Sequence, residues 1–282
     1  QEELTLKQAS NYVDEHTKNT TSQPININDL QSAANYTDKL EIVNGRLCIK
    51  GGDNTLTQDE KEWANEVGVV EADEEIITFQ KQGTGDLVLG SEVTTSNGET
   101  FYVIGGDTVG TEISDSTQNV ILLAKYNLTS EGTSQDTSVE DDNDFEFSST
   151  NYWSSVEGIE YPVDGEFKYP DLNDEKKYPM GDATSIVTIA KEYGAKLGAT
   201  GRLMTVEEIV LLGGSISENS TLGCPAYINS QDFWLGSAFS EDQVWGVSWY
   251  EYGVEGFING NFFDSDDCGI RPVIEVSKSL IK

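Results

Sequence analysis

The chain has few basic residues and a single histidine. Among its 282 residues, 17 lysines and arginines stand against 50 aspartates and glutamates, for a formal net charge of −33. So negative a surface repels phosphate backbones, which argues against nucleic-acid partners. His16 alone cannot build a histidine-rich metal site or an HExxH protease. Its polar surroundings also argue against a Ser-His-Asp hydrolase.

Long hydrophobic runs and cysteines are scarce as well. No stretch reaches the roughly 18 apolar residues of a membrane-spanning helix, so the sequence predicts no membrane span. Hydrophobic residues make up 37%, below the usual ~45–50%, while aromatics reach 10%, a balance that favours a loop-rich surface protein. The three cysteines, Cys48, Cys224 and Cys268, lack CxxC spacing and so predict no zinc site. Either Cys224 and Cys268 pair or all three are free thiols.

The first part of the chain reads as a small α+β region. Residues 3–16 carry apolar side chains near helical spacing, and the segment LEIVNGRLCIK alternates around Asn44-Gly45, as in a hairpin. The glycines at positions 83 and 85 mark a boundary. The sequence therefore predicts two domains, residues 1–82 and 83–282.

The second domain combines strands with two helices. Asn97-Gly98 predicts a hairpin turn, and residues 119–127 form a nearly continuous apolar run, as in a strand buried on both faces. Asp182 is the expected cap of a first helix. A capping box from Thr205 to Glu208 predicts a second helix.

Aromatic residues are concentrated near the end of the chain, in the pieces FWLGSAF, VWGVSWYEYG and GFINGNFFDSDD. Neighbours along a strand point to opposite faces, so Phe262 and Phe263 cannot both face the core. Exposed aromatics beside Asn, Asp and Ser have the composition of an adaptable binding surface. The alternative is that these aromatics form the core. Pro272 places the closing strand at an edge or a bulge.

The order of GRLMTVEEI, FWLGSA, VWGV and GIRPVIEV over residues 84–282 resembles a known fold. It is similar to the C-type-lectin-like fold of the formylglycine-generating-enzyme branch, and in particular to the variable proteins of diversity-generating retroelements. The resemblance implies an α+β domain with two helices and antiparallel sheets. It also implies that residues 119–127 lie near the closing segment GIRPVIEV.

The segment INDLQSAANY and its surroundings make residues 1–82 resemble the soluble part of a type IV pilin or pseudopilin. The resemblance implies a helix followed by a small antiparallel sheet. It further implies an extracellular, cell-surface location in a pilus or pilus-like assembly, with pilus subunits as partners of this region. An unrelated α+β spacer is the alternative.

The resemblance to retroelement proteins also sorts the aromatic residues. Their variable positions derive from AAC codons whose adenines are randomised, and such codons cannot encode Trp, Gln, Met, Lys or Glu. Trp234, Trp245 and Trp249 are therefore expected in the scaffold. The resemblance implies a face within residues 239–268 that recognises a protein or glycan ligand through Phe239, Tyr250, Tyr252, Phe257, Asn259, Asn261, Phe262, Phe263, Asp264 and Asp266.

Two other functions use the same region. A calcium-dependent lectin or adhesin could hold a cation at Asp264–Asp267, although the sugar-binding triplets Glu-Pro-Asn and Gln-Pro-Asp are absent; no other cofactor is expected. An enzyme of the formylglycine-generating type would need Cys224 and Cys268 as its pair. No nucleophile stands beside a base, so no catalytic residue is predicted. Arg271 is expected to be structural, its fork reaching carboxylates or carbonyls.

Overall fold

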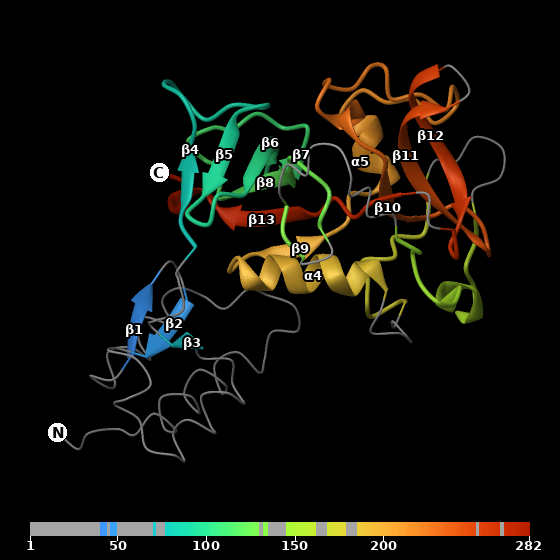
Figure 1. Ribbon diagram of the computed structural model, residues 1–282, viewed down its shortest axis with the longest axis horizontal. Coiled ribbons are helices and arrows are strands. Elements are labelled where there is room, and N and C mark those ends of the chain that lie inside the picture. Colours follow the sequence, from blue (N-terminus) through green and yellow to red (C-terminus); the bar gives the residue numbers. More distant parts are fainter. Residues whose placement is uncertain are drawn as a thin grey trace, which may run out of the picture. The chain divides into compact units, whose positions relative to one another are not determined.

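Among the regular elements of the described part of the chain, strands outnumber helices (Figure 1). The computed structural model describes residues 40–43, 46–49, 70–71, 77–129, 132–134, 145–161, 168–178, 185–251, 254–265 and 268–282. The helix predicted over 3–16 lies outside these residues. The chain divides into two units, Gln1–Thr78 and Phe79–Lys282.

The first unit contains a three-stranded sheet. Strands β1 (Leu40–Val43) and β2 (Arg46–Ile49) pair antiparallel with Val43 opposite Arg46, which confirms the predicted hairpin. Strand β3 (Val70–Glu71) runs parallel to β2, so the expectation of a purely antiparallel sheet is wrong. Parallel strands need a long connection, and residues 50–69 separate β2 from β3 in the sequence.

A seven-stranded sheet forms one layer of the second unit. Its strands follow the order β4-β5-β6-β8-β13-β9, and β7 pairs with β6. All of these strand pairs are antiparallel, which places the unit in the α+β class. The strands are β4 (Phe79–Lys81), β5 (Glu92–Thr95), β6 (Thr100–Gly106), β7 (Thr108–Val109), β8 (Asn119–Ala124), β9 (Thr200–Arg202) and β13 (Val273–Ser277).

The first and last residues of the second unit lie side by side. Phe79 forms a parallel bridge with Ile281. The Lys81 N–H donates to the Lys282 carbonyl at 2.8 Å, and the Lys282 N–H donates to the Phe79 carbonyl at 3.0 Å. Strand β4 therefore belongs to the second unit, whereas the boundary expected from the sequence falls just after it.

The closing strand β13 lies inside the sheet. It pairs with β8 on one side, with Ile274 opposite Leu122, and with β9 on the other. The expected proximity of residues 119–127 to the closing segment is thus confirmed. The prediction that Pro272 marks an edge or bulge is wrong, because this proline immediately precedes β13 and loses no ladder donor; its carbonyl accepts the Ala124 N–H at 2.9 Å.

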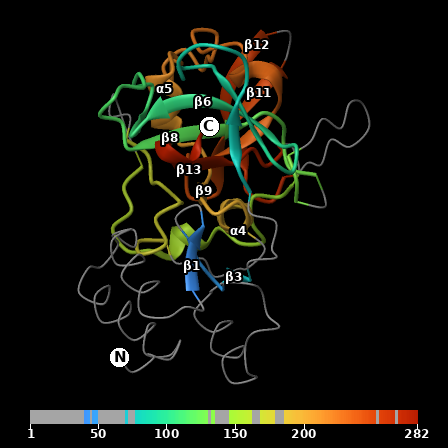
Figure 2. The same cartoon turned by 90° about the vertical axis from the view of Figure 1, so that its left-hand side faces the viewer.

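Both helices predicted for the second domain are present. Helix α4 (Ile186–Lys196) contacts β9 and β13, as Figure 2 shows beside β9, but its N-cap is Ser185 and the predicted cap Asp182 is wrong. The Ile186 N–H donates instead to the carbonyl of Phe147 at 3.1 Å. None of the helices in the described part of the chain has the length and apolar character to cross a bilayer.

Helix α5 (Val206–Leu211) confirms the second capping box. The Glu208 N–H donates to the Thr205 hydroxyl at 3.3 Å, and the Thr205 N–H donates to the Glu208 carboxylate at 2.9 Å. Val206 and Ile209 are buried. The described residues also form three 3₁₀ turns, η2 (Tyr152–Ser155), η3 (Ile228–Ser230) and η4 (Lys278–Leu280).

A smaller sheet packs over α5. It contains β10 (Phe233–Ala238), β11 (Gln243–Glu251) and β12 (Val254–Phe262), in that order. One apolar cluster joins the large sheet through Ile104 and Leu123, the helix through Ile209, and the small sheet through Phe233 and Trp245. This cluster fixes the small sheet on the large one.

Arg271 is a wholly buried cation just before β13. Its Nε and Nη2 donate to the carbonyls of Ala124 at 2.8 Å and Lys125 at 3.1 Å, Nη1 donates to Ile228 at 3.4 Å, and the guanidinium lies 5.3 Å from the Phe233 ring centre. Burial lowers the pKa of Arg271 to about 10, so it stays charged at neutral pH. The structural role predicted for Arg271 is confirmed, with carbonyls as its acceptors.

Candidate functional site

The β10–β12 sheet has two faces with different surroundings. Cross-strand register puts Trp245 opposite Gly260, and Gln243 opposite Phe262, on one face. Trp234 lies opposite Gly246 on the other. We call the first the open face, because it leads from the core to solvent, and the second the closed face.

The closed face is filled by an aromatic cluster. Trp234 is wholly buried, and its ring packs edge to face against Phe147 with centroids 5.8 Å apart. Phe147 in turn meets Trp153 at 5.8 Å, and Trp153 meets Phe263 at 5.9 Å. The indole Nε1 of Trp234 donates to the carbonyl of Phe145 at 2.6 Å. The expectation that Trp234 belongs to the scaffold is confirmed.

The open face reaches solvent at the end where β10 passes into β11. Phe239 is 36% exposed and Phe262 is 55% exposed, while Trp245 on β11 is 2% exposed. The rings of Phe239 and Trp245 meet edge to face at 4.8 Å, and Tyr169 meets Trp245 in the same way at 5.2 Å. We call these four residues, Tyr169, Phe239, Trp245 and Phe262, the aromatic platform.

A glycine makes room for this arrangement. A Cβ placed on Gly260 would lie 2.6 Å from ring carbons of Phe239, so any side chain there would displace that ring. Gln243 on β11 holds the backbone of β12 at this glycine, since its Nε2 donates to the Gly260 carbonyl at 3.2 Å. The Phe239 ring therefore rests directly on the backbone of β12.

The turn that carries Phe239 is held from several sides. Its backbone N–H donates to the Gln243 carbonyl at 2.8 Å. Trp153 Nε1 donates to the Ser240 carbonyl at 2.9 Å, and Asn151 donates to the Glu241 carbonyl at 3.0 Å. A ligand that met this turn would find it already ordered, which lowers the entropic cost of binding.

Trp245 carries an unused donor. Its Nε1 is buried and has no hydrogen-bond partner in the part of the chain that the structure describes. A buried donor without an acceptor costs about 1–3 kcal/mol. The platform thus holds a polar group that its own fold leaves unsatisfied.

Glu207 borders the platform from α5. Its carboxylate accepts the Tyr169 N–H at 2.6 Å, which ties the segment before Pro170 to the helix. Burial raises the pKa of Glu207, and the hydrogen bond from Tyr169 opposes part of that rise. Burial also raises the pKa of the Tyr169 hydroxyl.

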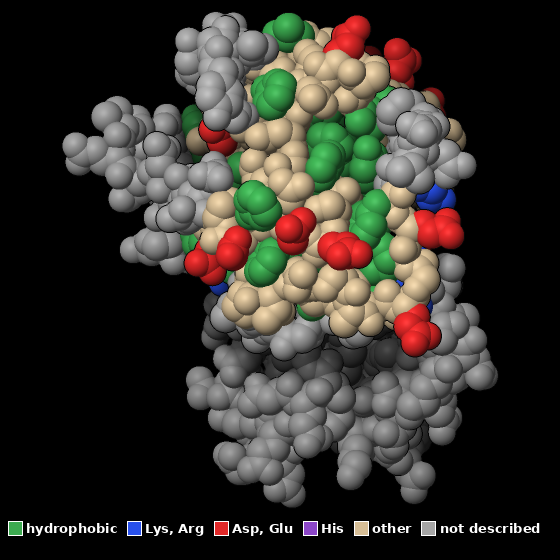
Figure 3. All heavy atoms as spheres, turned by 90° about the vertical axis from the view of Figure 1, so that its right-hand side faces the viewer, with side chains coloured by type: hydrophobic (Ala, Val, Ile, Leu, Met, Phe, Trp, Pro, Cys, Tyr) green, Lys and Arg blue, Asp and Glu red, His purple; other side chains and the backbone are tan. Residues whose placement is uncertain are grey.

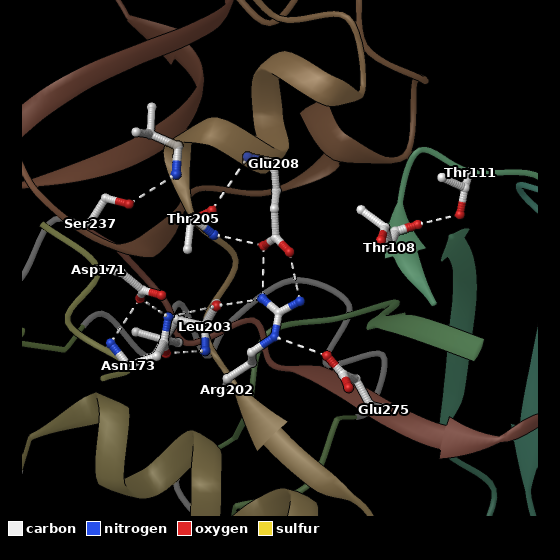
Figure 4. A network of polar contacts seen from close by, with 11 residues as sticks. Thr108, Thr111, Asp171, Asn173, Arg202, Leu203, Thr205, Glu208, Ser237 and Glu275 are labelled. Atoms are coloured by element: carbon white, nitrogen blue, oxygen red, sulfur yellow. Dashed lines mark hydrogen bonds and ion pairs between the residues drawn. The ribbon is translucent and has the colours of Figure 1, made fainter. Parts of the chain in front are cut away.

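A polar network braces α5 from below (Figure 4). Arg202 on β9 donates to both carboxylate oxygens of Glu208, at 2.8 and 2.6 Å, and lies 3.6 Å from Glu275 on β13. Burial works to lower the pKa of Arg202, but these carboxylates raise it overall. Ser237 on β10 accepts the Val206 N–H at 3.1 Å. The helix under the platform is thus tied to both sheets.

The ten residues expected to bind a ligand do not share one face. Phe239 and Phe262 lie at the open end, and Asp264 is exposed beyond β12. Phe257, Asn259 and Asn261 are half-buried on the closed face.

Phe263 is half-buried against Trp153, as described above, and accepts the Phe147 N–H at its carbonyl at 2.8 Å. Tyr250 lies opposite Glu255 in the register, but its side chain, like all of Tyr252 and Asp266, lies outside the described residues. Of the expected set, Phe239 and Phe262 are therefore the aromatics that the structure brings to the open end.

Sequence reasoning missed Tyr169, Gln243 and Gly260 at this place. It placed Trp245 in the scaffold, where the structure confirms it, yet this residue also forms the base of the platform. Alternation along β11 and the pairing partner of Trp245 would have pointed to Gly260, but Tyr169 lies far away in the sequence. Trp249 has no described side chain.

Cys224 and Cys268 are both buried and are not joined by a disulfide, so the possible bridge between them does not form. Cys224 belongs to the core cluster with Trp245, on the open-face side. Cys268 lies beside Asn261, whose Nδ2 is 3.4 Å from its sulfur, on the closed face. A disulfide would have to pass through the sheet. Burial raises the pKa of Cys224 to about 11, which keeps it a protonated thiol at neutral pH.

Within the described ranges, no three His, Cys, Asp or Glu side chains come together in a way that could hold a metal ion. Asp264 belongs to that part of the chain, while Asp266 and Asp267 lie outside it. The suggested cation site at Asp264–Asp267 therefore stays a prediction.

Figure 3 shows the side of the second unit on which the β10–β12 sheet lies. Hydrophobic side chains gather over its middle and acidic side chains lie around them. No protein-family model, no curated protein and no solved structure matches this chain.

Proposed function

We propose that the second unit is a ligand-binding module and that the aromatic platform is its contact surface. The observation that carries this proposal is a pair of exposed rings. Phe239 stands on the β10–β11 turn, which is already held in place, and Phe262 lies on β12 opposite Gln243. Exposed aromatic anchors on a rigid support supply contact area at low entropic cost. Because both rings are exposed, they contribute less to the hydrophobic core than a buried aromatic residue such as Trp234 does.

The architecture is proposed to be C-type-lectin-like, of the kind found in variable proteins of diversity-generating retroelements. The pairing of β8 with β13 supports this, as do the two helices and the separate small sheet that bears the aromatic residues. On the same ground the protein is proposed to act outside the cell. The first unit is proposed to attach it to a pilus or pilus-like assembly.

The cysteines favour a binding protein over an enzyme of the formylglycine-generating type. Such an enzyme needs two cysteines that act together, whereas Cys224 and Cys268 lie on opposite sides of the small sheet. A thiol with a pKa near 11 is also a poor nucleophile at neutral pH.

The test is a search for ligands that depend on Phe262. The protein would be screened against a random peptide library and a glycan array, and every ligand would be measured again on Phe262→Ser. Leu222→Ser is the matched control, because Leu222 is 65% exposed and lies outside the platform. We expect ligands that lose about tenfold or more in affinity on Phe262→Ser, as for removal of an aromatic anchor, and keep it on Leu222→Ser. If every ligand binds both variants equally, the platform is not the site.

A further inference from the structure

The chain around the aromatic platform carries charge of one sign. From Leu203 to Ile270 the sequence contains no lysine, arginine or histidine. The same stretch holds eleven acidic residues: Glu207, Glu208, Glu218, Asp232, Glu241, Asp242, Glu251, Glu255, Asp264, Asp266 and Asp267. The arginines that border the stretch are held inside the fold, Arg202 against Glu208 and Arg271 against backbone carbonyls. Neither offers a free cation to a ligand.

Three of these carboxylates lie at the rim of the platform. Glu241 and Asp242 belong to the turn that follows Phe239, and both are exposed. Asp264 is exposed shortly after Phe262. A hydrogen bond of 3.3 Å from the Phe263 N–H to the Asp242 carbonyl holds the two rim segments together. We call Glu241, Asp242 and Asp264 the acidic rim.

A surface of this kind discriminates between ligands by charge. Its field attracts cations and slows the approach of anions. The face of an aromatic ring also attracts a lysine ammonium or an arginine guanidinium. The long apolar stems of these side chains can pack on exposed rings while their charged ends reach carboxylates.

We propose that the platform binds a protein segment that presents lysine or arginine. The cationic end meets the acidic rim, and the stem packs on Phe239 and Phe262. A neutral glycan can hydrogen-bond to the rim carboxylates but gains no charge attraction from them, and an anionic glycan is repelled. This inference rests on the proposed function, since it names the ligand class of the same site.

Tyr169 has a basic neighbour, Lys168, which is exposed. The carbonyl of Pro170 accepts the Ala238 N–H at 3.0 Å, so the segment that carries Lys168 borders the turn at Phe239. One lysine does not offset the three carboxylates of the acidic rim, Glu241, Asp242 and Asp264. The surroundings of the platform therefore stay negative.

The experiment distinguishes the effect of the charges in the acidic rim from the effect of the negative charge of the whole protein. Random peptides are selected on the full chain, and those that lose affinity on Phe262→Ser are sequenced. We expect them to be enriched in Lys and Arg and depleted in Asp and Glu relative to the library. Their binding should also weaken as salt rises from about 50 to about 300 mM, where exposed charges are screened.

Two triple variants then remove equal charge from different places. Glu241→Gln, Asp242→Asn and Asp264→Asn together should weaken these peptides about tenfold, the sum of three exposed ion pairs. Asp86→Asn, Glu112→Gln and Asp115→Asn remove the same charge from exposed loops of the large sheet and should change affinity by less than about twofold.

Three other results would each contradict either this inference or the proposed function. If Phe262-dependent ligands are found but are glycans, or peptides without Lys and Arg enrichment, the inference is wrong and the proposed function stands. If both triple variants weaken binding equally, the rim has no part in it and the inference is wrong. If no ligand depends on Phe262, the proposed function itself fails.

Discussion

The two faces of the small sheet carry similar aromatic residues in different surroundings. On the closed face, Trp234 is wholly buried, packs on Phe147 and donates to the backbone carbonyl of Phe145. On the open face, Trp245 is nearly as buried, but the rings beyond it, Phe239 and Phe262, face solvent. The same residue type therefore stabilises the fold on one side and stands ready for a ligand on the other. What decides between the two is whether another segment of the chain covers the face.

The largest effect should come from Trp234→Ala. Removing this ring leaves a cavity beside Phe147, and we expect a loss of about 3–5 kcal/mol in the free energy of unfolding. Denaturant titration measures it. Trp234→Phe keeps a ring and loses mainly the bond to the Phe145 carbonyl, so it should cost less. Equal losses would mean that the cavity contributes nothing.

Arg271→Lys should come next. A lysine cannot reach the carbonyls of Ala124, Lys125 and Ile228 together, so buried acceptors lose their donor at a cost of about 1–3 kcal/mol. The melting temperature should fall, while binding by the folded protein should persist. Lost binding at unchanged stability would move Arg271 into the recognition site.

The two neighbouring phenylalanines should differ. Phe263→Ala removes a ring that packs on Trp153 and should destabilise the protein by about 1–2 kcal/mol. Phe262→Ala removes a largely exposed ring and should stay within about 0.5 kcal/mol of wild type. Thermal unfolding of both variants checks this. If Phe262→Ala lowers stability more than Phe263→Ala, the Phe262 ring is packed against other residues and is not exposed to solvent.

The smallest effect concerns Glu207. Its pKa is raised in the folded protein, mainly by burial, so in the pH range above its ordinary value the native state binds more protons than the unfolded state. This carboxyl therefore makes stability fall as pH rises through that range. Glu207→Gln keeps an oxygen acceptor for the Tyr169 N–H and should remove this fall. Unfolding free energies of wild type and variant, measured between about pH 4 and 7, give the difference.

Local signals in the sequence predicted local structure well. The capping box at Thr205, the pairing of β1 with β2 and the buried strand, which covers Asn119–Ala124 of the predicted 119–127, each depend on residues close together in the chain. Strand geometry also predicted that Phe262 and Phe263 do not both face the core, but it did not show that Phe263 is the one packed inside, against Trp153.

Long-range contacts could not be predicted in this way. Ser185 caps α4 in place of Asp182 because the first helical N–H bonds to Phe147, which lies far back in the sequence. The sequence left open whether Cys224 and Cys268 pair, and only the sheet between them decides it. Phe257, Asn259 and Asn261 alternate with Phe262 along β12 and therefore lie on its other face, but only tertiary packing shows that this face is the covered one.

The hydrogen bonds between Phe79, Lys81 and Lys282 bring both ends of the second unit to one place on its surface. A domain with adjoining ends can be inserted into a surface loop of a host protein through short linkers, or circularly permuted. Both linkers would leave from the β4 edge of the large sheet, and the platform belongs to a different sheet. The unit could thus serve as a graftable scaffold in which positions 239 and 262 are randomised while the closed face keeps the fold intact.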